Sequence, residues 1–243
     1  MAPSPVVTAT IQAAIIGAVS NILAQAISAQ KYDVRSKQSP VRKKRGATPF
    51  TIDWVPVVQF LIYGAISTPP NFMWQEFLES TFPASHPAPT SSAIASAAAG
   101  DEKALDRSAL EGRLVEPKLN KANTFIKTVL DQTLGSAVNT IAFIVFMHAV
   151  RAGMEHRDVG SAGSWAFLTS GDTIRYDAIR WVVVWERARA EVWGIMRASW
   201  AFWPFVSLLN FGLLKTVAAR NLAASLAGVA WGVYMSLVAA RES

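Results

Sequence analysis

Three histidines and several carboxylates are the side chains of this 243-residue chain with the chemistry to bind a metal or move a proton. His148, Glu155, His156 and Asp158 lie close together, after a long apolar segment. Gly153 stands between them, and a glycine there is expected to end a helix, so the four side chains do not share one helical face. The chain also has no cysteine, no glycine-rich phosphate loop and no nucleophile motif. We therefore expect no metal, no cofactor and no enzyme activity.

A basic run offers a second kind of chemistry, the binding of anions. It consists of Arg42, Lys43, Lys44 and Arg45, in a chain whose net charge is +6. Such a run can bind nucleic acid, or it can contact phospholipid headgroups and carry a targeting signal. Because it lies between long apolar segments, we favour headgroup contact or targeting, and we expect no nucleic-acid partner.

Polar and small residues recur at helical spacing inside the apolar segments. The candidates for a pore lining or for hydrogen bonds between helices are Asn21, Gln25, Asp131, Gln132, Asn139, Asn210 and Arg220. The candidates for close helix packing are Gly17, Gly135, Gly228 and Gly232. Polar groups are costly in a membrane and often functional there, but small and polar residues also join helices, so a water-lined path and close packing both remain open. Asp131 is expected to pair with Lys127, four residues earlier, or with an arginine of another helix.

Apolar residues make up 51% of the chain and charged residues only 16%, and long stretches carry no charge at all. A helix crosses the hydrocarbon layer of a bilayer with about 20 apolar residues. We predict spans at about 6–29, 55–78, 128–150 and 220–240. The predicted fold is an all-α integral membrane protein, a single membrane domain over 1–243, with a bundle of four transmembrane helices plus an amphipathic interfacial helix.

Interfacial helices are predicted at 172–197 and 198–214, and the second contains Pro204, which should break a helix interior. In the first of them apolar residues recur at steps of three and four, with arginines beside them: Ile174, Ala178, Trp181, Trp185, Ala188, Val192 and Ile195. This pattern is typical of a helix in the membrane interface, and equally of a helix docked on the bundle.

The connecting segments differ in charge. The first, 30–53, is basic, and the region 83–119 opens with a Pro/Ser/Ala-rich stretch that predicts disorder. The positive-inside rule places the first and third loops on the cytoplasmic or matrix side, with both termini opposite.

Four segments together carry a resemblance to a known family: FLIYGAISTPPNFMWQEFLE (60–79), KTVLDQTLGSAVN (127–139), WAFWPFVSLLNF (200–211) and WGVYMS (231–236). They resemble the twenty-two-kilodalton peroxisomal membrane protein family, which includes the mitochondrial inner-membrane Mpv-seventeen branch. The motif residues are Trp200, Trp203, Pro204, Asn210, Phe211 and Trp231. The likeness covers Val6 to Val238 apart from two inserts, Lys31 to Ala47 and Pro83 to Leu119.

The resemblance implies a four-span protein of an organelle membrane, linked to small-solute permeability, without enzyme activity or cofactor. The chain departs from the family pattern at Pro69, Ser207 and Gly232, where the family carries Gly, Gln and Asn. These changes remove polar groups from the region expected to line a pore. A pore-like channel or its regulator is therefore one hypothesis, and a membrane scaffold or sorting protein is the alternative. An alternating-access transporter ranks third, because no inverted repeat is visible.

We expect the peroxisomal membrane rather than the mitochondrial inner membrane, because no Arg or Lys precedes Lys31 and a basic cluster follows the first span. The expected partners are the lipid bilayer, further copies of the chain in a homo-oligomer, and the peroxisomal membrane-protein import machinery.

Overall fold

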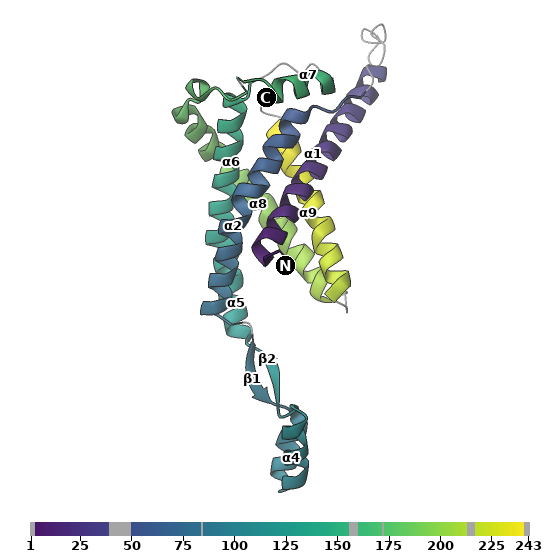
Figure 1. Ribbon diagram of the computed structural model, residues 1–243, viewed down its shortest axis with the longest axis vertical. Coiled ribbons are helices and arrows are strands. Elements are labelled where there is room, and N and C mark those ends of the chain that lie inside the picture. The colour runs from purple at the N-terminus through teal and green to yellow at the C-terminus, as the bar shows by residue number, and fades with distance from the viewer. Residues whose placement is uncertain are drawn as a thin grey trace. The chain divides into compact units, whose positions relative to one another are not determined.

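The computed structural model describes the backbone of residues 3–38, 50–83, 85–155, 160–171, 173–212 and 217–240. It describes the side chains of the same residues except 31–38, 160, 207–212, 217–222, 224, 225, 239 and 240. The helices are α1 (Pro5–Gln38), α2 (Trp54–Thr81), α3 (Ser91–Ala98), α4 (Glu102–Leu110), α5 (Lys121–Leu130), α6 (Ser136–Gly153), α7 (Gly160–Leu168), α8 (Trp181–Gly212) and α9 (Val217–Ala240) (Figure 1). A π-helical turn, η1 (Asp131–Gly135), follows α5, a 3-10 turn, η2 (Tyr176–Ala178), precedes α8, and two short strands are β1 (Ser85–Pro89) and β2 (Val115–Leu119).

The chain forms two compact units where the sequence predicts a single domain. Unit 1 comprises Met1–Phe72 and Ser136–Ser243, and unit 2 comprises Met73–Gly135. Helix α2 therefore begins in unit 1 and ends in unit 2. The second unit corresponds largely to the region between the second and third predicted spans.

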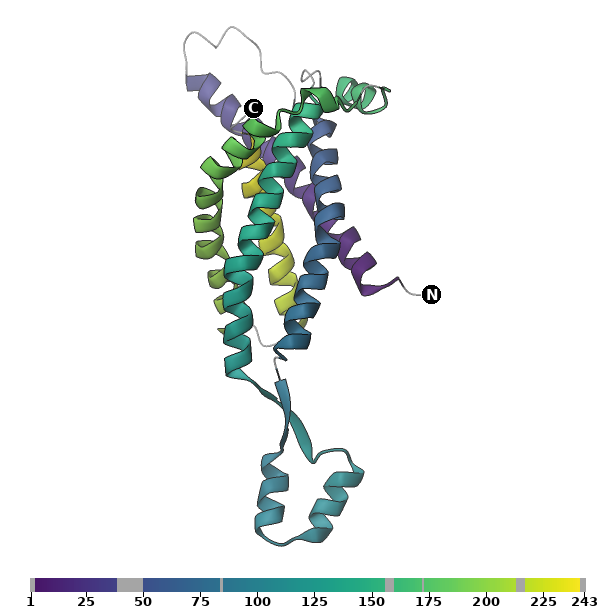
Figure 2. The same ribbon diagram turned by 90° about the vertical axis from the view of Figure 1, so that its left-hand side faces the viewer.

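Two helix pairs build unit 1: α1 lies along α9, and α6 lies along α8 (Figures 1 and 2). The buried core cluster consists of Phe60, Phe143, Ile144, Met147, Ala188, Ile195 and Met235. Helix α2 meets α6 through aromatic rings, with the Tyr63 and Phe143 centroids 5.2 Å apart, edge to face. This core holds the helices that carry the candidate polar residues.

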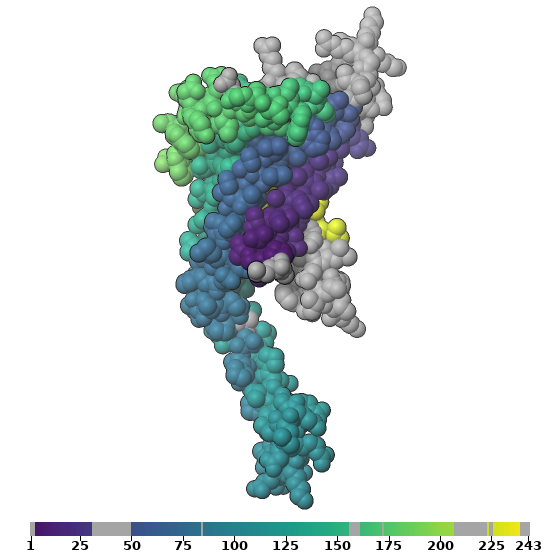
Figure 3. Space-filling view, viewed as in Figure 1, coloured from purple at the N-terminus to yellow at the C-terminus, as the bar shows by residue number. Residues whose placement is uncertain are grey.

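Helix α1 lies against α2 (Figure 3). Glycines on both helices lie at this contact. A Cβ on Gly17 would lie 3.1 Å from the carbonyl oxygen of Phe60, and a Cβ on Gly64 would lie 3.1 Å from the Cα of Ala14. Small residues allow two helix backbones to approach this closely. Substituting either glycine would push the two helices apart.

Unit 2 is ordered where the sequence predicts disorder in 83–119, so that expectation is wrong for the residues described there. Strands β1 and β2 pair antiparallel, from Ser85 opposite Leu119 to Pro89 opposite Val115, and lead to helices α3 and α4 (Figure 2). The side chains of Thr90 and Asp101 cap these two helices at Ala93 N and Ala104 N. These local caps and the strand pairing order a composition that, taken as an average, resembles a linker.

Helix α8 is continuous from Trp181 to Gly212, so the predicted break at Pro204 is wrong. A proline removes one backbone donor, but apolar helices tolerate it when neighbouring contacts hold both sides. The ring of Phe202, two residues before the proline, stacks on Trp231 of α9, with the centroids 5.5 Å apart. The predicted start at residue 172 is also too early, because α8 begins at Trp181, after η2.

Two helical segments are long and apolar enough to cross a bilayer within the described residues, Pro5–Gln30 and Lys121–Gly153, and a shorter apolar helix covers Leu226–Val238. The predicted spans 6–29 and 128–150 lie inside the first two. The predicted spans 55–78 and 220–240 lie inside α2 and α9, and their crossing of the bilayer stays a prediction. The basic loop expected from residue 30 starts later, since α1 continues to Gln38.

Candidate functional site

The polar side chains of α1 lie against α9. Ser20 and Asn21 are almost fully buried, as is Ser236 of α9. The Asn21 Nδ2 donates to Ser236 Oγ at 2.6 Å, and Ser20 Oγ donates to the carbonyl oxygen of Val229 at 3.2 Å. The contact is close, because a Cβ on Gly232 would lie 2.7 Å from Ser20 Cβ. Here a glycine on one helix makes room for a hydroxyl on the other.

Gln25 extends this network from α1 to the start of α2. Its Nε2 donates to Asn21 Oδ1 at 2.8 Å and to the carbonyl oxygen of Asp53 at 2.7 Å, and its Oε1 accepts from Asp53 N at 2.8 Å. Asp53 Oδ1 in turn accepts from Val55 N at 3.0 Å, which caps α2. A continuous chain of hydrogen bonds therefore runs from Ser236 through Asn21 and Gln25 to the α2 cap.

A second polar contact joins α2 and α6. Asn139 Nδ2 donates to Asn71 Oδ1 at 3.1 Å, and the Tyr63 hydroxyl donates to the Asn139 carbonyl oxygen at 3.3 Å. Thr140 is buried beside Asn139 in sequence, and Gln59 is 2% exposed. Within the described part of the chain, Gln59 Oε1 has no hydrogen-bond partner. Amide groups thus occupy the interior of unit 1 on α2 as well as on α1.

An imidazole and a carboxylate join α6 and α8. His148 Nε2 lies 2.7 Å from Glu191 Oε1, and the two side chains are 10% and 17% exposed. With Arg151 they line a small cavity of about 10 Å³. From the sequence alone His148 is a candidate only for a metal site, and Glu191 is no candidate at all. The available signal was the spacing of Glu191, three residues after Ala188 and four before Ile195 on the buried side of α8.

The buried stripe of α8 differs from the predicted one. Ala188 and Ile195 are buried and Val192 is half-buried, as the periodicity indicates, but Trp181 and Trp185 are 55% and 48% exposed. Val184 and Ser199 complete the buried side instead. The apolar pattern therefore predicts the helix correctly, but it assigns the wrong residues of the first turns to the buried face.

In unit 2, Asp131 lies against α2 and not against Lys127. The Asp131 Oδ1 accepts from Gln75 Nε2 at 2.7 Å and from Trp74 Nε1 at 3.2 Å. A Cβ on Gly135 would lie 2.8 Å from that same Trp74 nitrogen, so the glycine makes room for the indole. Gln132 follows Asp131 in η1 and is half-buried. Among the described residues, Asp131 forms no ion pair with Lys127 or with an arginine, so the expected pair is absent there.

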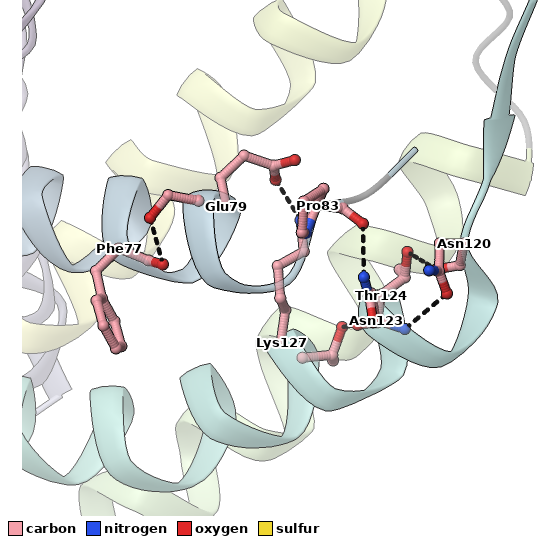
Figure 4. A network of polar contacts seen from close by, with 9 residues as sticks. Phe77, Glu79, Pro83, Asn120, Asn123, Thr124 and Lys127 are labelled. Carbon is pink, nitrogen blue, oxygen red and sulfur yellow. Dashed lines mark hydrogen bonds and ion pairs between the residues drawn. The ribbon is translucent and has the colours of Figure 1, made fainter. Parts of the chain in front are cut away.

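Lys127 instead forms an ion pair with Glu79 of α2 (Figure 4). Nearby, Asn120 caps α5 through Asn123 N at 3.0 Å, and Asn123 Nδ2 donates to the carbonyl oxygen of Pro83 at 3.1 Å. These contacts fix the end of α2 against the start of α5. Lys127, Asn120 and Asn123 are half-buried, so these contacts help to order unit 2.

Several predicted residues do not join these networks. Among the described residues, no atom lies within 4 Å of where a Cβ on Gly228 would stand, so close packing falls to Gly232. The side chains of Asn210, Phe211 and Arg220 lie outside the described residues, as do Arg42, Lys43, Lys44 and Arg45. No group of three or more His, Asp or Glu residues that could hold a metal ion occurs in the described part of the chain.

The aromatic motif residues join α8 to α9. The rings of Phe202, Trp203, Trp231 and Tyr234 form a cluster, with the two tryptophan centroids 6.0 Å apart. Trp200 is partly exposed and Pro204 is exposed on α8. The cluster carries no titratable group with an obvious chemical role, so its role is to hold α9 against α8.

Comparison with known proteins gives one family match. The family model described as "Mpv17 / PMP22 family" matches residues 178–236, a segment that contains Trp200, Trp203, Pro204, Asn210, Phe211 and Trp231. No curated protein and no solved structure matches the chain. The family and the apolar helices together indicate an organelle membrane protein. Over residues 178–236 the chain is therefore similar to the Mpv17/PMP22 family, in agreement with the resemblance carried by its sequence motifs.

Proposed function

We propose that the protein is an integral membrane protein of the peroxisome that contributes to small-solute permeability, as a pore-like channel or its regulator. The observation that carries this proposal is the distribution of polar and apolar groups in unit 1. Ser20, Asn21 and Ser236 are buried between helices, while large apolar side chains face outward. A water-soluble bundle also has an apolar core, but it covers most of its outer surface with polar side chains, so the apolar outer face favours a lipid environment.

The outward face of α1 illustrates the point. Its exposed large residues recur at every fourth position: Val7, Ile11, Ile15, Val19 and Leu23. They form one apolar stripe along the helix, and the buried polar residues of α1 are not on that stripe. A lipid environment satisfies such a stripe without any protein partner. The same reading applies to the exposed Val138 and Ile141 of α6.

The inward face supports a path for polar solutes. The bonds from Ser236 through Asn21 and Gln25 to Asp53 give a line of donors and acceptors between α1, α9 and the start of α2. These groups are bonded to one another, which corresponds to a closed state. A small separation of α1 from α9 would expose the same groups to water and solute.

Reconstitution into liposomes tests this proposal. We expect purified protein to let uncharged solutes such as glycerol and glucose across the vesicle membrane faster than empty vesicles do. The double variant Asn21→Leu, Gln25→Leu removes the polar line and should reduce flux at least several-fold, whereas the lipid-facing variant Ile15→Val should not. Folded protein with no flux above empty vesicles would exclude the channel role.

A scaffold role is the alternative, and a feature of unit 2 favours it. An open apolar pocket lies between helices α3 and α4 and the adjoining ends of strands β1 and β2. Its lining includes Ile94, Leu105, Leu114 and Val115. Ile94 and Val115 are more than half exposed. An affinity capture of the full chain compared with the variant Ile94→Glu, Val115→Glu tests this role. Identical partners and identical oligomeric state for both proteins would argue against it.

The same proposal includes peroxisomal location, a homo-oligomer, recognition by the peroxisomal membrane-protein import machinery, and no enzyme activity. It rests on the family similarity and on the basic run Arg42 to Arg45. A fluorescently tagged chain imaged with organelle markers tests the location. Overlap of the tagged chain with a mitochondrial marker would instead favour the alternative location, the mitochondrial inner membrane.

A further inference from the structure

A basic pocket of about 200 Å³ lies between the last turns of α6 and the start of α8. Three polar residues line it. They are His148 of α6, Arg187 of α8, and Arg180, the residue directly before α8. The remaining lining residues are alanines and valines, and no Asp or Glu is among the lining residues in the described part of the chain. It therefore combines two permanent positive charges with an apolar floor.

Arg180 and Arg187 both line this pocket. They are seven residues apart, and residues about two helical turns apart lie on the same face of a helix. Both side chains are exposed. Among the described residues neither forms an ion pair with a carboxylate, whereas Arg175 pairs with Asp177 at 3.7 Å. Two arginines at one pocket, neither of them in an ion pair with a described carboxylate, are suited to a phosphate group, which guanidinium binds through paired hydrogen bonds.

His148 is fixed in place beside them. Its Nε2 lies 2.7 Å from Glu191 Oε1, and Glu191 lines the small neighbouring cavity together with Arg151, not the basic pocket. The carboxylate thus orients the imidazole without lying on the wall of the basic pocket.

The position of the pocket along the helices fits the depth of lipid headgroups. The apolar segment Lys121–Gly153 ends one residue after Ala152, which lines the pocket. Trp181 and Trp185 are exposed on the first turns of α8. Tryptophan is enriched at the level of the headgroups, and basic pockets at the ends of membrane helices bind anionic lipid headgroups.

We propose that this pocket binds a phosphate group, carried by a phospholipid headgroup or by a free phosphate compound. The lipid source rests on the membrane location proposed above, whereas the phosphate chemistry does not. The pocket is independent of the polar line between α1 and α9, since none of its lining residues belongs to those helices.

The test uses the full chain purified in a neutral detergent. Binding of phosphatidic acid, of phosphatidylcholine and of inorganic phosphate is measured for the protein as it exists, for Arg180→Gln, Arg187→Gln together, and for Arg189→Gln. Arg189 is the matched control, since it is an exposed arginine of α8 that does not line the pocket. Each lost arginine should weaken phosphatidic acid binding about five-fold, so the double variant should lose about 25-fold and the control less than two-fold.

The outcomes separate the sources. Loss of phosphatidic acid binding alone identifies a headgroup site, and a parallel loss of inorganic phosphate binding identifies a site for free phosphate as well. Equal binding by the double variant and the native protein, an equal loss in Arg189→Gln, or no binding by the native protein overturns the proposal. Unchanged thermal unfolding of the variants confirms that they fold. Absent solute flux with phosphate binding retained would remove the channel role and leave this site standing.

Discussion

Asn21 makes its hydrogen bonds along its own helix and across a helix contact at the same time. It accepts from Gln25 one turn further on and donates to Ser236 of α9. The i, i+4 spacing of Asn21 and Gln25 is visible in the sequence, and so is their polar character. Their partners Ser236 and Asp53 are not, because they depend on which helix lies alongside α1. A polar residue in an apolar helix can therefore be recognised from the sequence, but not what it binds.

Replacing Asn21 by leucine should destabilise the protein by about 1–2 kcal/mol. The change keeps the size of the side chain but leaves Ser236 and Gln25 without one bond each in a buried contact. The midpoint of thermal unfolding in mild detergent measures the effect. Ile15→Val on the exposed face of α1 is the control and should change stability by less than about 0.5 kcal/mol. Equal midpoints for Asn21→Leu and the native protein would contradict the buried contact.

Gly232→Ala and Gly228→Ala form a matched pair on α9. A Cβ on Gly232 meets Ser20 at 2.7 Å, whereas a Cβ on Gly228 meets no described atom within 4 Å. Gly228→Ala should stabilise α9 by about 0.5–1 kcal/mol through its helix preference. Gly232→Ala should destabilise the protein, and Ser20→Gly in the same chain should restore part of the loss. The same unfolding assay compares all three, and an equal gain for both glycines would count against the α1–α9 contact.

At the level of elements, the positions of the long helices could be predicted from the sequence. Which face of each helix is buried could not. The spans predicted at 6–29, 55–78, 128–150 and 220–240 all fall within helices, because length and apolar content follow directly from the residues. The rotation of α8 was misjudged at Trp181 and Trp185. Tryptophan counts as apolar in a periodicity, but its ring also suits an exposed place at a membrane surface.

The π turn η1 had no signal in the sequence. It comprises Asp131–Gly135, and it adds a residue to one turn, so the faces before and after it do not follow a period of 3.6. The helical spacing of the candidates Asp131, Gly135 and Asn139 depends on that period. The order of unit 2 was missed for a related reason, since Thr90 and Asp101 act through single capping bonds that an average composition does not register.

The contact of α6 with α8 yields a prediction at this scale. His148→Leu and Glu191→Leu should each destabilise the protein by about 2 kcal/mol, because each leaves a mostly buried partner without its charged hydrogen bond. The double variant should lose less than the sum of the two. Thermal unfolding of the four proteins gives the coupling energy. Strictly additive losses would show that the 2.7 Å contact contributes no net stability.

For the whole molecule, the number of times that the chain crosses a bilayer decides which loops lie on the same side. Four crossings place residues around 51 and around 99 on opposite sides, since α2 lies between them. If only the segments Pro5–Gln30 and Lys121–Gly153 cross, both positions lie on the same side. The polar line between α1, α9 and the start of α2 lies within the membrane only if α2 and α9 also cross.

The absence of cysteine makes this question directly measurable. Thr51→Cys, Ala99→Cys and Ser170→Cys each introduce one thiol at an exposed position. Sealed organelles carrying each variant are treated with a membrane-impermeant maleimide, before and after permeabilisation. We predict that Cys at 51 and at 170 label alike and that Cys at 99 labels oppositely. Identical labelling at 51 and 99 would contradict the four-span bundle, and recovery of the protein in the soluble fraction would contradict the membrane account altogether.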